Sequence, residues 1–158
     1  MSMRFVLHLE HLRHFQNHGS ILFEALITPA DCSLLETTIS QFVRKISKNN
    51  LENVRWRESV FRSIPEISFV IQKRRLSTFA AELVHRPKLS LVRDYWLFPG
   101  EEIPQGNEDC QLFLPLSGRG CGSGIFFIGP YPQELYEWDN QAKSGLLLMF
   151  SSAGHAIL

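Results

Sequence analysis

NEDCQLFLPL, residues 107–116, is the segment from which the fold can be read most directly. It predicts a β-strand, because a short apolar run lies between segments rich in Pro and Gly. Successive side chains of a strand point to opposite faces. One face would be polar at its start and would line a wet pocket; it carries Asn107, Asp109, Gln111 and Phe113. The other face would pack on the core; it carries Glu108, Cys110, Leu112 and Leu114.

Three more apolar runs of similar length occur in the same half of the chain. They are Leu89–Phe98, Gly124–Ile128 and Gly145–Phe150. Short apolar runs separated by Pro and Gly are typical of antiparallel β structure. Residues 88–158 are therefore predicted to be mainly strand.

The N-terminal half has helical patterns instead. Residues 8–18 place apolar side chains three apart and predict a short amphipathic helix. A strand is predicted over residues 21–27. A helix then starts at Thr28-Pro29-Ala30-Asp31, because Thr can cap, Pro suits the first helical position and Asp favours the positive helix start. A second long helix is predicted from Pro65 to Val84. Residues 1–87 are thus mainly helical, and residues 1–158 are expected to form a single α+β domain.

Composition narrows the class of protein. The chain has 158 residues, 44% of them hydrophobic, so we expect a sizeable core. Its 16 basic and 16 acidic residues cancel, which gives no general attraction to nucleic acid or to anionic membranes. The three cysteines form no CxxC pattern, and the N-terminus does not resemble a signal peptide. No apolar run approaches the roughly 20 residues of a membrane span. We therefore expect a cytoplasmic protein.

Four segments, taken in order, resemble the phytanoyl-CoA dioxygenase-like proteins, which are Fe(II)- and 2-oxoglutarate-dependent oxygenases. They are Phe15–Cys32, the Pro99-Gly100 turn, Gly124–Pro130 and Gly145–His155. The resemblance implies a double-stranded β-helix, the jelly-roll or cupin-like barrel, with the N-terminal helices packed on one of its sheets. It also implies Fe(II) and 2-oxoglutarate as cofactors.

The resemblance also implies a metal site. Such a site holds iron with two imidazoles and one carboxylate, which leaves positions open for co-substrate and oxygen. Carried over to this chain, the metal ligands are Asp109 and His155, and Asn107 stands where the family has a histidine. The neutral amide of Asn107 is a poorer ligand for Fe(II) than an imidazole nitrogen.

The co-substrate site departs from the family pattern as well. The family anchors 2-oxoglutarate with an Arg that follows the distal histidine, and this sequence ends at Leu158 without one. An Arg–carboxylate contact is strong and selective, so its loss would weaken co-substrate binding. Arg93, Arg119 and Gln111 are the candidates that could replace it.

We expect, on these grounds, an oxygenase-like protein with a degraded metal and co-substrate site. It would not be a standard hydroxylase, and it would bind a small acidic ligand or a protein. One alternative is an active Fe(II)-dependent oxygenase in which Asp109 and His155 hold the metal. Another is a metal-responsive, DNA-binding regulator. In that case the histidines at 11, 14 and 18 would sense iron and the basic run Lys73-Arg74-Arg75 would contact DNA.

Overall fold

The structure, a computed structural model, describes residues 7–47, 64–97, 108–116, 121–129 and 145–152. Within these residues the chain forms four helices and five strands. The helices are α1 (Leu9–His18), α2 (Pro29–Ser47), α3 (Pro65–Lys73) and α4 (Leu76–Leu83). The strands are β1 (Ser20–Phe23), β2 (Leu89–Leu97), β3 (Cys110–Pro115), β4 (Gly124–Phe127) and β5 (Gly145–Ser152). The predicted α+β class is confirmed.

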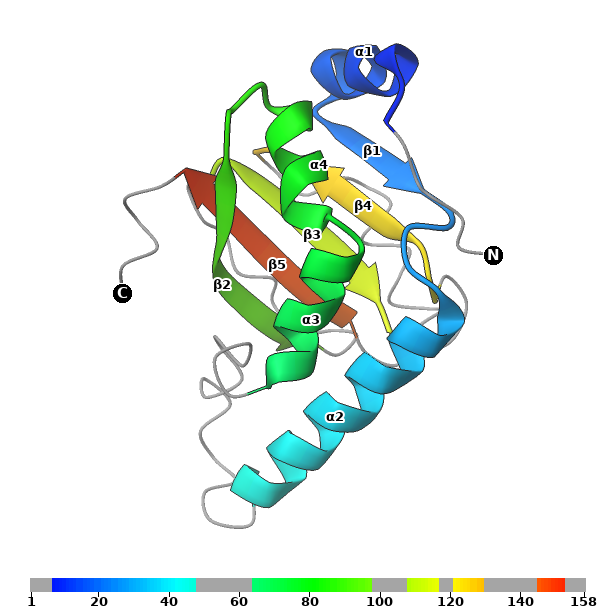
Figure 1. Ribbon diagram of the computed structural model, residues 1–158, viewed down its shortest axis with the longest axis vertical. Coiled ribbons are helices and arrows are strands. Elements are labelled where there is room, and N and C mark those ends of the chain that lie inside the picture. The colour runs from blue at the N-terminus through cyan, green and yellow to red at the C-terminus, as the bar shows by residue number, and fades with distance from the viewer. Residues whose placement is uncertain (1–6, 48–63, 98–107, 117–120, 130–144, 153–158) are drawn as a thin grey trace.

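The strands form one antiparallel sheet in the order β1-β4-β3-β5-β2. β3 lies at the centre, where Leu112 is aligned with Phe126 of β4 and with Leu148 of β5. β2 and β5 form the longest ladder, which a β-bulge interrupts between Leu91 and Arg93. The helices lie on one side of this sheet (Figure 1). None of the helices in the described residues combines the length and the apolar character that crossing a bilayer requires.

The helix-facing side of the sheet forms the larger core cluster. Leu112, Phe126 and Leu148 are fully buried at its centre. The helical side chains packed with them include Phe15, Leu35, Ile39, Ile67, Leu76 and Phe79. Fully burying a side chain of this size stabilises the fold by about 1.5–3 kcal/mol relative to leaving it exposed. This cluster therefore holds the helices on the sheet.

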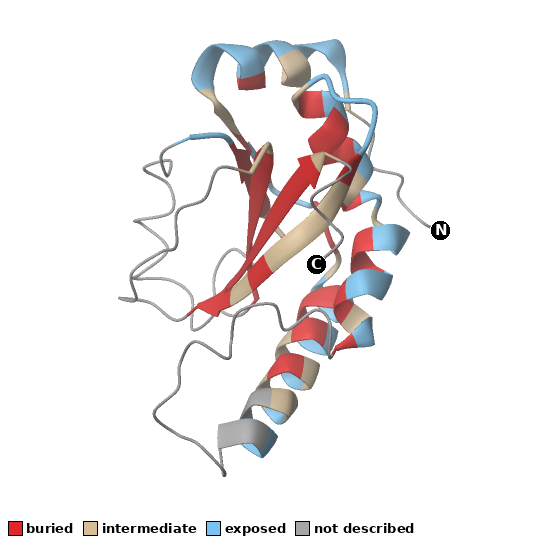
Figure 2. Cartoon of the chain, turned by 90° about the vertical axis from the view of Figure 1, so that its left-hand side faces the viewer, coloured by how far each residue is buried: buried red, intermediate tan, exposed pale blue. Residues whose placement is uncertain are grey.

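The opposite side of the sheet carries a second apolar cluster. Its members are Leu97, Phe113, Ile125, Phe127, Leu147 and Met149. None of them is more than 6% exposed, although no described helix contributes to this cluster. Figure 2 shows most of the strand residues coloured as buried, whereas β2 is intermediate over much of its length. The sheet is therefore largely apolar on both faces, with Asp94 on β2 and Gln111 on β3 as buried polar exceptions.

The alternation predicted for residues 107–116 applies from Cys110 onward. Cys110 and Leu112 belong to the helix-side cluster, whereas Phe113 belongs to the opposite one. Residues 108 and 109 precede β3, so strand alternation does not set the direction of their side chains. The orientation of Glu108 and Asp109 is therefore given by their observed contacts and not by strand alternation.

The strand predicted over residues 21–27 is too long, because β1 ends at Phe23. Leu26 and Ile27 lie in a turn, where their backbone N–H groups donate to the carbonyl of Gly122 at 2.8 and 3.1 Å. Both side chains are nevertheless buried. The apolar run reflects burial in the core rather than a continuing strand.

The single helix predicted from Pro65 to Val84 is wrong, because the chain breaks into α3 and α4. Arg75 adopts the left-handed conformation, with φ 58° and ψ 37°, and its N–H donates to the carbonyl of Gln72 at 3.2 Å. A residue other than glycine in this conformation costs about 1–2 kcal/mol.

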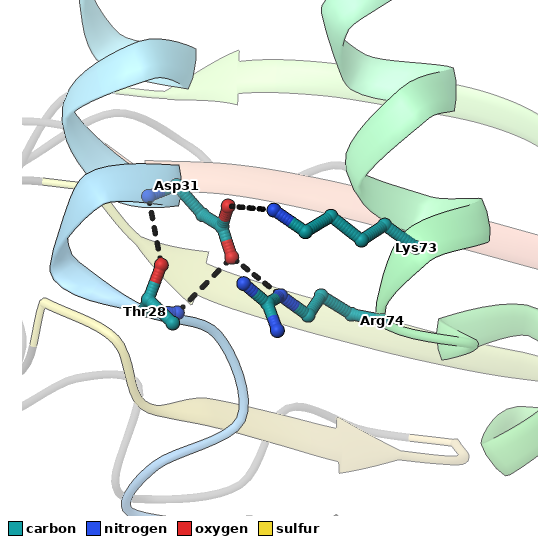
Figure 3. Close-up of polar contacts among 4 residues, drawn as sticks. All are labelled: Thr28, Asp31, Lys73 and Arg74. Carbon is teal, nitrogen blue, oxygen red and sulfur yellow. Dashed lines mark hydrogen bonds and ion pairs between the residues drawn. The ribbon is translucent and has the colours of Figure 1, made fainter. Parts of the chain in front are cut away.

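Arg74 is held by Asp31, at the start of α2 (Figure 3). Its Nε donates to Asp31 Oδ2 at 2.6 Å, and Lys73 Nζ lies 3.9 Å from Oδ1. The same carboxylate accepts the N–H of Thr28 at 3.1 Å, while the Thr28 hydroxyl accepts the N–H of Asp31 at 3.1 Å. This reciprocal cap satisfies two N–H groups that a helix start leaves without partners. Asp31 thus joins the start of α2 to the α3–α4 break.

The charge of Asp31 is stabilised by these contacts. Burial alone would raise its pKa, but the hydrogen bonds from Arg74 and Thr28 and the charge of Arg74 hold the pKa below the ordinary value of 3.8. Because the folded-state pKa is the lower one, the stabilisation is present above pH 3.8 and is lost as the pH falls through the folded-state value.

We expect Asp31→Ala to lower the free energy of unfolding by about 2–3 kcal/mol at neutral pH, because a cap and a charged hydrogen bond are both lost. Asp31→Asn should lose less, and it should lack the acid-dependent part of the wild-type stability. Urea denaturation followed by circular dichroism, from neutral pH to about pH 2, measures both effects.

Glu24→Gln is the matched control, because Glu24 is exposed in the turn after β1. Its effect should stay within about 0.5 kcal/mol. A wild type and an Asp31→Asn variant with parallel stability curves below about pH 4 would contradict the assigned role of the carboxylate.

Candidate functional site

Polar side chains gather where β3 begins, β5 ends and α4 leads into β2. Glu108 and Asp109, called the acidic pair below, immediately precede β3. The register that aligns Cys110 with Phe150 brings this end of β3 beside Ser152, the last residue of β5. The acidic pair includes the predicted metal ligand Asp109, so its contacts decide what the site can bind.

Asp109 is engaged by the protein on both oxygens. Its Oδ2 accepts the backbone N–H of Ser152 at 2.7 Å. Its Oδ1 lies 4.0 Å from Nη2 of Arg86, which follows the end of α4. The short bond fixes the end of β5 against the start of β3, and the longer contact partly balances the charge. Asp109 therefore has a structural role in the described part of the chain.

Glu108 is the more deeply buried of the two acids, with its side chain 5% exposed. Nη2 of Arg93 donates to its Oε1 at 2.9 Å. Arg93 is aligned with Met149, so it lies on the side of the sheet opposite the helices. The second oxygen, Oε2, is buried and has no hydrogen-bond partner in the structure as described. A buried acceptor without a partner is uncommon, and it marks a position that a hydrogen-bond donor would satisfy.

The remaining predicted site residues are distributed as follows. Gln111 is buried on β3, aligned with Phe127 and Met149 on the face away from the helices. Asn107, Arg119 and His155 lie outside the described residues. The structure thus brings Asp109, Arg93 and Gln111 to one end of the sheet. The metal site predicted from Asn107, Asp109 and His155 stays a prediction.

The described residues do not by themselves form an Fe(II) site, and Asn107 and His155 of the predicted set lie outside them. Among the residues that the structure describes, no three His, Cys, Asp or Glu side chains come together in a group that could hold a metal ion. Asp109 would have to give up the Ser152 N–H to bind a cation through Oδ2. Arg93, a candidate for the co-substrate carboxylate, already pairs with Glu108.

The histidines of α1 make local contacts. The backbone N–H of His8 donates to Nδ1 of His11 at 3.0 Å, and Nδ1 of His18 lies 2.9 Å from the carbonyl of His14. The rings of His14 and His18 stack at 4.2 Å. Burial, followed by the nearby His8, holds the pKa of His11 below its ordinary value. These contacts favour a helix-capping role over the predicted iron sensor.

A cleft of about 560 Å³ opens beside Arg86, between the α3–α4 pair and the start of β2. Two cations, Arg86 and Lys88, line it together with one acid, Glu82. The other lining residues include the hydroxyls of Ser77 and Thr78 and the apolar side chains of Ile71 and Leu89. Pockets of this size accommodate small molecules. Sequence patterns did not predict the cleft, because residues from α3, α4 and β2 line it together. The Arg86-Pro87-Lys88 run was the available signal.

The chain belongs to the family described as a domain of unknown function, DUF5070, which it matches over residues 3–156. It is similar to CT296 from Chlamydia trachomatis. A 1.8 Å resolution structure of that protein is 43% identical, with a TM-score of 0.83 over 97% of this chain and 100% of that chain. A 2.5 Å resolution structure of the selenomethionine-labelled protein is 42% identical, with a TM-score of 0.83 over 96% of this chain and 100% of that chain. None of the curated proteins matches.

We expect Asp109→Ala to lower the free energy of unfolding by about 1–2 kcal/mol in chelator-treated protein, because the Ser152 N–H loses its acceptor. Asp109→Asn should lose less, since its amide oxygen can still accept. Adding Fe(II) under anaerobic conditions should leave the wild-type unfolding midpoint unchanged. A midpoint that rises with Fe(II) in the wild type but not in Asp109→Asn would reassign Asp109 as a metal ligand.

Proposed function

We propose that this chain keeps the scaffold of an Fe(II)- and 2-oxoglutarate-dependent oxygenase, similar to the phytanoyl-CoA dioxygenase-like proteins, and binds a small anionic ligand instead of hydroxylating a substrate. The observation that carries the proposal is the state of the acidic pair. Both carboxylates at the end of the sheet where the resemblance puts the metal are engaged by protein groups.

Two features of the fold support an oxygenase-like barrel. The antiparallel sheet carries the N-terminal helices on one face only (Figure 1). Its other face is apolar and buried, from Phe127 on β4 to Leu147 on β5. A jelly-roll consists of two sheets that bury such a face between them. We infer that the described sheet is one of those two sheets.

The sequence at the metal position agrees with a degraded site. Asn107 offers an amide where Fe(II) prefers an imidazole. Asp109 accepts a short hydrogen bond from the backbone. Glu108 pairs with Arg93 through Oε1, while its Oε2 is buried without a described partner. The amide at Asn107 and the hydrogen bond at Asp109 would both weaken metal binding at this position.

The cleft beside Arg86 supports the choice of an anionic ligand. Its two cations outnumber the single acid Glu82. Arg86 is half-exposed, and its contact with Asp109 is a long one of 4.0 Å. It can therefore turn to a carboxylate or phosphate without giving up a short bond. Arg in particular binds such groups through two parallel hydrogen bonds.

We predict that the purified chain, given Fe(II), 2-oxoglutarate and ascorbate, releases no succinate above a metal-free control. Asn107→His should bind Fe(II) more tightly and still release none, because Arg93, a candidate anchor for the co-substrate, already pairs with Glu108. Asn107→Gln, which keeps an amide at the position, is the matched control. Robust succinate release by the wild type would overturn the proposal, and release by Asn107→His alone would reduce the defect to a single ligand.

We also predict that 2-oxoglutarate or inorganic phosphate binds in the cleft, as measured by isothermal titration calorimetry. The double substitution of Arg86 and Lys88 by Gln should weaken binding by about tenfold or more, because charge-assisted hydrogen bonds are lost. Arg13→Gln, at an exposed position on α1, is the matched control. Equal affinities in the double variant and the control would rule out the cleft as the site.

A further inference from the structure

The cleft beside Arg86 contains many side chains that can form hydrogen bonds. Five neutral polar residues line it in addition to the charged ones: Ser68, Gln72, Ser77, Thr78 and Ser90. Three of its apolar lining residues are almost inaccessible, since Ile71 is 6% exposed, Ala81 5% and Leu89 3%. Polar side chains are therefore the main groups that a ligand in this cleft would contact.

Helical spacing arranges the polar groups of the cleft in pairs on α3 and α4 (Figure 1). Ser68 and Gln72 are four residues apart on α3, and Thr78 and Glu82 are four residues apart on α4. Side chains at this spacing lie on the same face of a helix, about 5–6 Å apart. Each of the two helices thus presents a pair of hydrogen-bonding side chains to the cleft.

The side chains of these two pairs have no hydrogen-bond or ion-pair partner within the described residues. Helical hydroxyls outside the cleft differ in this respect. On α2, the Thr38 hydroxyl donates to the carbonyl of Leu34 at 2.7 Å, and the Ser40 hydroxyl donates to the carbonyl of Glu36 at 2.7 Å. The polar groups of the cleft are therefore available to a ligand.

The end of α4 fixes the cations of the cleft on a defined backbone. His85 adopts the left-handed conformation with φ 56°, and the N–H of Arg86 donates to the carbonyl of Ala81 at 2.9 Å. This combination is a common way of ending a helix, although glycine usually occupies the left-handed position. Pro87 then restricts the backbone, and Lys88 follows immediately before β2. Arg86 and Lys88 are thus held close to each other in the lining.

Glu82 narrows the class of ligand that fits. An ionised carboxylate can only accept hydrogen bonds, and it repels a ligand that is anionic throughout. A lining with Glu82 and two cations therefore suits a ligand that has both an anionic group and hydroxyl donors. A phosphate monoester carries about −1.5 to −2 charges near neutral pH, which two cations can balance. A phosphate ion alone would fill only a small part of the 560 Å³ cleft.

We propose that the cleft binds a phosphorylated sugar or sugar alcohol, an assignment that rests on the proposed function. The phosphate lies at Arg86 and Lys88, where the proposed function puts the anion. The hydroxyls of the ligand bond to the polar pairs of α3 and α4. A ligand with an acyl chain fits less well, because the almost inaccessible apolar side chains offer little area for the chain to cover.

Isothermal titration calorimetry with inorganic phosphate, glucose 6-phosphate, hexyl phosphate and glucose tests this assignment. Glucose 6-phosphate should bind about tenfold more tightly than inorganic phosphate, because its hydroxyls add hydrogen bonds. Hexyl phosphate has the same number of carbons without those hydroxyls, and its affinity should stay within about threefold of that of phosphate. Glucose, which lacks the anionic group, should bind at least about tenfold more weakly than glucose 6-phosphate.

The double substitution Gln72→Met and Thr78→Val removes one hydrogen-bonding group from each helix, at exposed positions. It should reduce the preference for glucose 6-phosphate over phosphate to about threefold or less. The matched control is the double substitution Gln16→Met and Thr37→Val, at exposed positions on α1 and α2. The control should keep the tenfold preference, and circular dichroism checks that both variants are folded.

Phosphate binding without a preference for glucose 6-phosphate would overturn the assignment and leave the proposed function standing. An equal gain in affinity with hexyl phosphate would also overturn it, because the body of the ligand would then be apolar. So would a tenfold preference that survives the double substitution of Gln72 and Thr78. If none of these probes binds, and 2-oxoglutarate does not bind either, both the assignment and the proposed anion site are wrong.

Discussion

The arrangement of the helices depends on one carboxylate, that of Asp31. It closes the cap of α2 with Thr28 and receives the guanidinium of Arg74 at 2.6 Å. Arg74 is followed by Arg75, whose left-handed backbone separates α3 from α4. The ion pair therefore helps to set where the helical segment breaks, and with it the course of α4 over the sheet. Residues of both helices, among them Ile71 of α3 and Ser77 of α4, line the cleft beside Arg86.

The sheet imposes the second constraint. Leu112 and Phe113, neighbours on β3, are both buried, one on each face. Glu108 and Asp109 immediately precede β3, at the end of this apolar sheet. Buried polar groups in proteins are almost always hydrogen-bonded. Arg93 and the Ser152 N–H each satisfy one carboxylate oxygen of this pair, and Arg86 lies 4.0 Å from a third. The fourth oxygen, Oε2 of Glu108, has no described partner.

Local pattern predicted most of the described elements, because periodicity and capping signals act over a few residues. It failed where tertiary contacts determine the backbone. Leu26 and Ile27 are apolar because they enter the core from a turn, and strand and buried turn look alike in sequence. The break at Arg75 lacks the glycine that usually marks one. The position of Asp109 at a sheet end was predictable from its strand, whereas its bond to Ser152 depends on the pairing of β3 with β5, which no local signal encodes.

The formal charges of the chain cancel, but the described ones are not distributed evenly. Asp31, Glu108 and Asp109 each contact a cation of the protein. Arg86, the cation that contacts Asp109, also lines an open cleft together with Lys88. A cation that approached Asp109 through Oδ2 would have to break a 2.7 Å bond to a backbone amide, whose N–H would then lack an acceptor. An anion that approached Arg86 would replace a contact of 4.0 Å at a half-exposed side chain. These two contacts are the physical basis of the proposal that this end of the sheet binds an anion in place of a metal ion.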